Sequence, residues 1–200
     1  MFLKNFWLKL TNNPEYQKTR NEDLRKKVIL SFKNEHEEEI NIIRKKIYQQ
    51  NELNFLHSGH AADIVNVLPV IKKLSESHKC NLYIQINKPI KSYFRHPAGK
   101  YYLNDKIFNM LFPLLNNQKY LNKVEKFDNQ KIDINFDLLR DLPINLLFDN
   151  ATYANVITGV KANLFEPFLE ADDHREIKNK IIIQRSYRYR NDLINYKFLN

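Results

Sequence analysis

Short apolar runs alternate with helical patterns from residue 51 onward, and this alternation constrains the fold more than any other feature. LNFLH reads as a strand, and the helix after it has a regular apolar face. That face consists of Ile64, Val67, Leu68, Ile71 and Leu74. The later segments predict a strand over NLYIQI, a helix over DKIFNMLFPLL, short strands near KVEKF and KIDINF, a helix over INLLFDNATYANVIT ending near Gly159, and a strand over KIIIQ. Strands and helices in this order predict an α/β domain.

The stretch HSGHAAD, residues 57–63, joins the first expected strand to its helix. Ligands of open α/β sheets bind at the carboxyl ends of strands, so polar residues here indicate a candidate site. Gly59 permits backbone conformations that other residues resist, and the first amides of the next helix favour an anion or a polarised oxygen. Asp63 lies near the helix start, where it is either an N-cap or a general base.

A metal at the same loop is a further alternative, because His57, His60 and Asp63 are spaced three residues apart. A strand residue and two turn residues rarely converge on one ion, and a single cysteine, Cys80, excludes a cysteine-based zinc cluster. The GxSxG nucleophile elbow and the dinucleotide and Walker fingerprints are missing from a chain with three glycines. We therefore expect neither a metal nor a cofactor.

Positive charge is concentrated at the two ends of the chain. Residues 1–50 hold 11 Lys and Arg against 7 Asp and Glu, residues 51–174 hold 14 against 14, and residues 175–200 hold 7 against 2. A central domain that wrapped nucleic acid should carry its own basic face. We therefore expect no nucleic-acid partner, and keep a basic nucleic-acid adaptor as the weakest alternative.

The basic segment RSYRYRN follows the last expected strand. The side chains in it that could hold a diphosphate through charge-assisted hydrogen bonds are Arg185, Ser186, Arg188, Arg190 and Asn191. A solvated basic edge, or a nucleic-acid contact with Tyr187 and Tyr189 stacking on bases, would use similar residues. These residues alone leave the alternatives open.

The first 50 residues predict a helical extension. Phe2, Leu3, Phe6, Trp7 and Leu10 recur at helical spacing, which suits a helix docked on its own core or one lying on a membrane surface. A second apolar stripe follows at Ile40, Ile43 and Ile47. All apolar runs are far shorter than the roughly 20 residues that cross a bilayer. With one cysteine and no signal-peptide cleavage pattern, we expect a cytoplasmic protein, with peripheral contact to the inner membrane through residues 1–10 as an alternative.

The segment HSGHAADIVNVLP resembles the first strand and loop of heptosyltransferase-like glycosyltransferases of the GT-B fold, which follow the pattern S-x-G-x-x-G-D-I-x-x-x-L-P. Ala62 stands where that pattern has its second glycine. The resemblance continues through LYIQINKP, HPAGKYYLNDKIFNMLFPLLNNQKYLNKVE, KIDINFDLLR and IIIQRSYRYRN, and covers roughly residues 54–196. It implies a Rossmann-like acceptor domain over residues 51–174 and the start of a donor-binding domain over residues 175–200.

The resemblance also implies an activity: inverting transfer of a sugar from a nucleotide-sugar donor to a glycan or lipopolysaccharide-type acceptor of the cell envelope. Asp63 falls at the position of the family's catalytic base, and the basic segment falls where the donor phosphates bind. The residues expected on the acceptor side are Ser58, Gly59, His60, Asn87 and His96. A non-catalytic glycan-binding or interaction module derived from this fold is the alternative.

In the family, more than a hundred further residues complete the donor domain after the basic segment. We therefore expect the 200-residue chain to bind sugar nucleotide weakly by itself, and to transfer sugar only when a donor-domain polypeptide is supplied.

Overall fold

A four-stranded parallel sheet is the centre of the structure, a computed structural model that describes residues 9, 13–90, 99–141, 150–163 and 165–171. The strands are β1 (Glu52–His57), β2 (Lys79–Ile84), β3 (Lys123–Lys126) and β4 (Ile134–Asn135). β1 pairs along its whole length with β2, from Glu52 opposite Lys79 to His57 opposite Ile84. The α/β class is confirmed, and the all-parallel sheet is compatible with a Rossmann-like fold.

The strand order β3-β2-β1-β4 places a topological switch point at the carboxyl ends of β1 and β4. The chain runs outward from β1 to β2 and β3, and then returns to add β4 on the other side of β1. In open α/β sheets, ligands bind in the crevice that forms at such a point.

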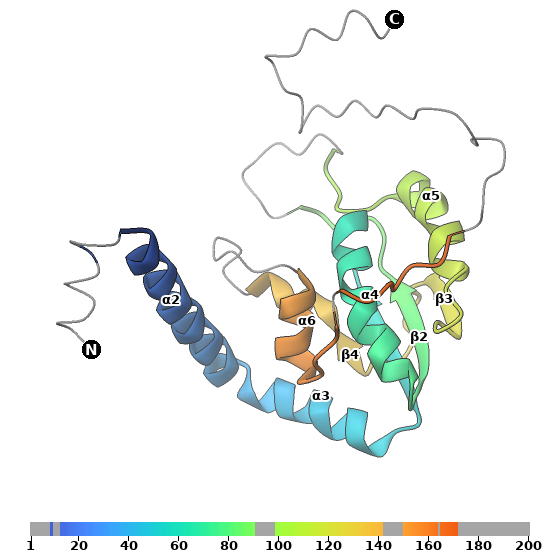
Figure 1. Ribbon diagram of the computed structural model, residues 1–200. Helices are drawn as coiled ribbons and strands as arrows, with labels where there is room; N and C mark the ends of the chain where they lie inside the picture. Colours follow the sequence, from blue (N-terminus) through green and yellow to red (C-terminus); the bar gives the residue numbers. More distant parts are fainter. Residues whose placement is uncertain (1–8, 10–12, 91–98, 142–149, 164, 172–200) are drawn as a thin grey trace, which may run out of the picture. The chain divides into compact units, whose positions relative to one another are not determined.

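Helix α4 (Ala61–Ser75) covers the sheet and confirms the predicted helix after β1. Its expected apolar face is buried in full, with relative exposures of 0 to 3 % from Ile64 to Leu74. Figure 1 shows α4 between α6 (Asn150–Thr158) and α5 (Asp105–Asn116), and it contacts both helices. On the sheet, Phe55 of β1 stacks on Phe136, just after β4, with ring centroids 5.6 Å apart.

The other predicted elements that lie within the described residues are confirmed with shifted ends. NLYIQI forms β2, which begins two residues earlier than predicted. DKIFNMLFPLL forms α5. The Asn104 side chain caps the first turn of α5 by accepting from the Ile107 N–H at 3.0 Å. KVEKF gives β3. KIDINF forms only the two residues of β4 before a 3-10 helix, η1 (Phe136–Asp141), begins.

The helices before the sheet are α2 (Asn13–Glu35) and α3 (Glu37–Gln49). α3 confirms the predicted apolar stripe, since Ile40 and Ile43 are each 3 % exposed and belong to the core. The Lys46 ammonium donates to the Ile132 carbonyl at 3.2 Å, which joins α3 to the segment before β4. This part of the expected extension is therefore packed on the α/β domain.

Apart from Ala171, the described residues belong to one compact unit within residues 1–170. The expected apolar stripe of residues 2–10, the strand KIIIQ and the basic segment RSYRYRN lie outside the described residues, apart from the exposed Lys9. The predicted start of the helix over INLLFD, residues 144–149, also lies outside them. Among the helices that the structure describes, none is long and apolar enough to span a membrane.

Candidate functional site

Asp137 is the centre of a polar cluster at the switch point. It follows β4 in η1, and its carboxylate accepts four hydrogen bonds from residues after three different strands. The Ser58 N–H donates to Oδ1 at 2.9 Å, and the Ser58 hydroxyl donates to Oδ2 at 2.5 Å. The Lys88 ammonium donates to Oδ2 at 2.6 Å, and Arg140 Nη1 donates to Oδ1 at 2.5 Å. We call Ser58, Lys88, Asp137 and Arg140 the switch-point cluster.

These bonds decide the charge state of Asp137. Burial by itself raises the pKa of the carboxyl, but Arg140 and the hydrogen bonds from Lys88 and Ser58 outweigh burial and hold the pKa well below its usual range. A carboxylate with two donors on each oxygen has its acceptor positions filled. Asp137 is therefore a permanent negative charge that holds its partners in place, and it is poorly suited to take up a proton.

His57, the last residue of β1, lies beside the cluster as a neutral imidazole. Burial lowers the pKa of His57 from 6.5 to about 4; the Asp137 and Asp63 carboxylates oppose this effect only in part, and the Arg140 charge adds to it. The Gly59 N–H donates to His57 Nδ1 at 2.8 Å, so the proton of the neutral ring is on Nε2. Nε2 is buried and has no hydrogen-bond partner within the part of the chain that the structure describes.

Gly59 is required by close packing at this turn. A Cβ at residue 59 would lie 2.5 Å from His57 Cε1, 2.8 Å from Asp63 Cβ and 2.9 Å from Arg140 Nη2. The His57 ring is completely buried and cannot move aside, whereas Asp63 and Arg140 are partly exposed, so a Cβ at this turn would collide with His57. Glycine is therefore needed here because of space.

Asp63 belongs to the capping box of α4. The helix begins at Ala61, His60 is the N-cap, and Asp63 Oδ2 accepts from the His60 N–H at 3.0 Å. This bond fixes the carboxylate at the helix N-terminus, on the carboxyl edge of the sheet. Asp63 therefore has a capping role, but from the third helical residue: the N-cap itself is His60, and the Asp63 side chain accepts from the N-cap N–H.

The Tyr102 ring contacts both the turn before α4 and the switch-point cluster. Its ring lies 5.1 Å from the His60 ring, and the Arg140 guanidinium carbon lies 4.3 Å from the Tyr102 ring centroid. The Tyr102 N–H donates to the Lys88 carbonyl at 3.1 Å, which fixes the backbone after β2. Loops that are distant in sequence are therefore held together at one edge of the sheet.

The structure brings Ser58, Gly59, His60 and Asp63 of the predicted site together at this edge. Asn87 has a positive φ of 58°, and its N–H donates to the Leu103 carbonyl at 2.7 Å, one residue before Lys88. His96 and the predicted phosphate-binding residues lie outside the described residues. Sequence reasoning missed Lys88, Asp137 and Arg140. Their signal was their position after two segments that were expected to be strands: Lys88 lies two residues after NLYIQI, and Asp137 and Arg140 lie one and four residues after KIDINF.

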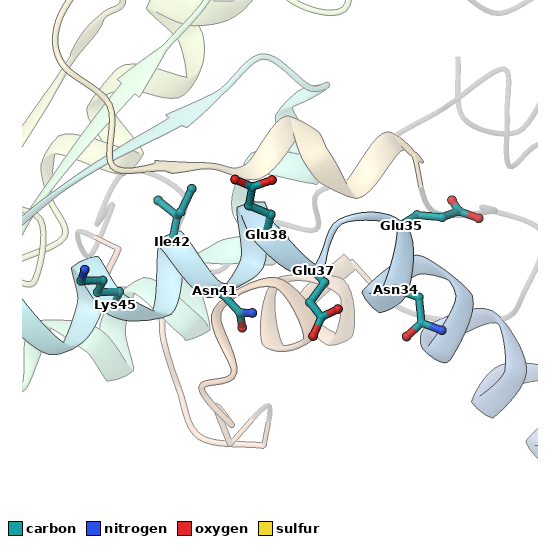
Figure 2. Close-up of a pocket in the computed structure, with 7 residues that line it drawn as sticks. All are labelled: Asn34, Glu35, Glu37, Glu38, Asn41, Ile42 and Lys45. Atoms are coloured by element: carbon teal, nitrogen blue, oxygen red, sulfur yellow. The ribbon is translucent and has the colours of Figure 1, made fainter.

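A separate open pocket of about 650 Å³ lies at the junction of α2 and α3. Its lining includes Glu37, Glu38, Asn41 and Ile42. Figure 2 shows that Glu38 and Ile42 extend from one side of α3 while Glu37 and Asn41 extend from the other. Because its polar groups diverge, this pocket is a weaker candidate site than the switch point.

No group of three or more His, Cys, Asp or Glu side chains in the described ranges is arranged to hold a metal ion. Comparison of the chain with protein-family models, with curated proteins and with solved structures finds no match.

Proposed function

We propose that the chain is the acceptor-side part of a GT-B glycosyltransferase, which transfers a sugar from a nucleotide-sugar donor to a glycan hydroxyl with inversion. One observation carries the proposal: the loop HSGHAAD, on which the resemblance rests, lies at the carboxyl end of β1, next to the switch point. This is the place where open α/β sheets bind their ligands.

Asp63 is the proposed general base. Inverting transfer needs a carboxylate within hydrogen-bond reach of the attacking hydroxyl. The bond from the His60 N–H to Asp63 Oδ2 orients the carboxylate at the start of α4. Asp137 is less suited to this role, because its two oxygens already accept four hydrogen bonds.

The switch-point cluster would support this chemistry by fixing the loop. Ser58 is completely buried and binds Asp137 through both its N–H and its hydroxyl. Such contacts restrict the turn that precedes Asp63, and a base held in one geometry contributes more to a transfer reaction than a mobile one.

A non-catalytic glycan-binding module is the second candidate. The capping contact of Asp63 favours it, since a carboxylate engaged with its own helix can serve structure alone. In that case the loop and the switch-point cluster would bind a glycan without any transfer of sugar.

Acceptor-dependent release of nucleoside diphosphate distinguishes the two candidates. The chain, carrying a GT-B donor-domain polypeptide fused after Asn200, is assayed with panels of nucleotide sugars and glycans. We expect release that needs an acceptor and that falls at least about a hundredfold in Asp63→Asn, because general-base catalysis contributes about 10²–10⁴ to the rate. Asp128→Asn, in the exposed turn after β3, is the control. Equal release by Asp63→Asn would rule out the assigned base, and glycan binding without release would favour the module.

A further inference from the structure

We propose that Lys72, Gln118 and Tyr120 form a docking site for an extended peptide, and that residues 163–170 of the same chain, which we call the strap, fill this site and close it to other peptides. Lys72 lies in the last turn of α4, at the other end of this helix from the switch point, and Gln118 and Tyr120 lie between α5 and β3. Figure 1 shows the chain after α6, coloured orange to red, crossing α4 toward α5. The inference goes beyond the proposed function and does not depend on it.

Gln118 makes the central contacts of the site. Its Nε2 donates to the Glu170 carbonyl at 2.9 Å, and its Oε1 accepts from the Glu170 N–H at 2.9 Å. Nε2 also donates to the Leu114 carbonyl at 2.6 Å, and the Gln118 carbonyl accepts from the Leu121 N–H at 2.9 Å. The last two bonds hold the Gln118 side chain and main chain in place without any part of the strap. The site is therefore preformed, and Gln118 pairs with Glu170 as a neighbouring β-strand would.

Two further side chains bind the main chain of the strap. The Tyr120 hydroxyl donates to the Phe168 carbonyl at 2.8 Å, and the Lys72 ammonium donates to the Pro167 carbonyl at 2.7 Å. Burial raises the pKa of Tyr120 above its ordinary value, so the hydroxyl keeps the proton that it donates. Since carbonyl groups are the same in every peptide, these contacts suit any extended chain that reaches the site.

The strap itself fits the site incompletely. Of its large apolar side chains that the structure describes, only Phe168 packs against the core, and it is half-buried. Phe165 is 98 % exposed and Leu169 is 37 % exposed. The ion pair between Lys119 and Glu170 lies at the surface, where such pairs contribute little. A segment with so few buried apolar contacts opens while the rest of the domain stays folded, and another peptide can then compete for the site.

These contacts specify the chemistry of the partner. Its main chain is extended and presents carbonyl groups to Lys72, Tyr120 and Gln118. It carries an aromatic side chain at the position of Phe168, two residues before the residue that pairs with Gln118. The peptide NLFEPFLEA, which copies residues 163–171, has this pattern and is therefore the probe.

The probe peptide is titrated into the isotope-labelled 200-residue chain, and the amide signals of Gln118 and Glu170 are followed. Displacement of the strap should move the Glu170 signal toward its value in an unfolded chain. Phe168→Ala removes the apolar anchor of the strap and favours the open state, so this variant chain should bind the probe at least about tenfold more tightly than the wild type. A peptide that carries the same Phe168→Ala change is the control, and it should bind more weakly than the probe.

Gln118→Leu in the Phe168→Ala chain removes both bonds to the main chain of the partner and should weaken binding at least about tenfold. Gln49→Leu, at an exposed position of α3, is the matched control in the same background and should leave binding unchanged. Thermal unfolding shows whether each variant is folded. If Gln118→Leu does not fold, Tyr120→Phe takes its place and should weaken binding about threefold to tenfold, since it loses one hydrogen bond.

Three results would overturn the docking site. The first is the absence of saturable binding of the probe to the folded Phe168→Ala chain. The second is equal binding after loss of the Gln118 amide or the Tyr120 hydroxyl. The third is loss of folding in Phe168→Ala itself, which would show that the strap belongs to the core of the domain and does not open.

Discussion

Replacing His57 by asparagine should remove a large part of the pH dependence of stability. The folded chain holds the pKa of His57 at about 4, against 6.5 for an unperturbed histidine, chiefly because the ring is buried. As pH falls below 6.5, the unfolded chain takes up a proton that the folded chain does not, so stability decreases with a slope of up to about 1.4 kcal/mol per pH unit. Between pH 7.5 and 4.5 the free energy of unfolding should therefore lose up to about 3 kcal/mol through this residue.

Asparagine suits this test because its side-chain oxygen can replace Nδ1 as the acceptor for the Gly59 N–H. Urea denaturation from pH 4.5 to 7.5 gives the free energy of unfolding of the wild type, His57→Asn and the control His36→Asn. The range stays above pH 4, so that the stabilisation from the depressed pKa of Asp137, which is lost only at lower pH, remains in place. His57→Asn should show the flatter profile. A pH slope equal to that of the wild type would refute the burial argument for His57.

Two further substitutions test the packing and the charge of the site. Gly59→Ala should reduce the free energy of unfolding by about 1–3 kcal/mol in urea denaturation, because its Cβ would lie 2.5 Å from His57 Cε1; an unchanged midpoint would contradict the described turn. Asp137→Asn should reduce the free energy of unfolding by about 3–5 kcal/mol, because it leaves the Lys88 and Arg140 cations without a counter-charge. Asp105→Asn breaks only the exposed pair with Lys126, so it should reduce the free energy of unfolding by less than about 1 kcal/mol. Equal losses for the two aspartate variants would show that the cluster contributes no more than a surface ion pair.

Local sequence patterns were sufficient to predict the helices and strands of the α/β domain that the structure describes. The apolar stripe of α4 repeats at helical spacing, and Leu53 and Phe55 alternate along β1, so each pattern follows from burial of one face. The capping residue Asn104 similarly marks the start of α5. β4 was expected to be longer, but its pairing with β1 covers only two residues before η1 begins.

The site could be predicted only in part, because its decisive contacts are distant in sequence. Ser58 and Asp137 are 79 positions apart, and Lys88 and Asp137 are 49 apart. A pattern within one segment indicates a strand end, but it does not say which strand ends become neighbours. That information lies in the order β3-β2-β1-β4, which places β4 beside β1.

The most direct test of the central claim is to map where the ligand binds. Isotope-labelled chain is titrated with nucleotide sugars and glycans, and the amide chemical shifts are assigned to residues. We predict the largest shifts at the turn of residues 58–61 and at Lys88 and Arg140, which lie around the carboxyl ends of β1, β2 and β4. Shifts confined to the α2–α3 pocket around Glu38, with none at the switch point, would contradict the account.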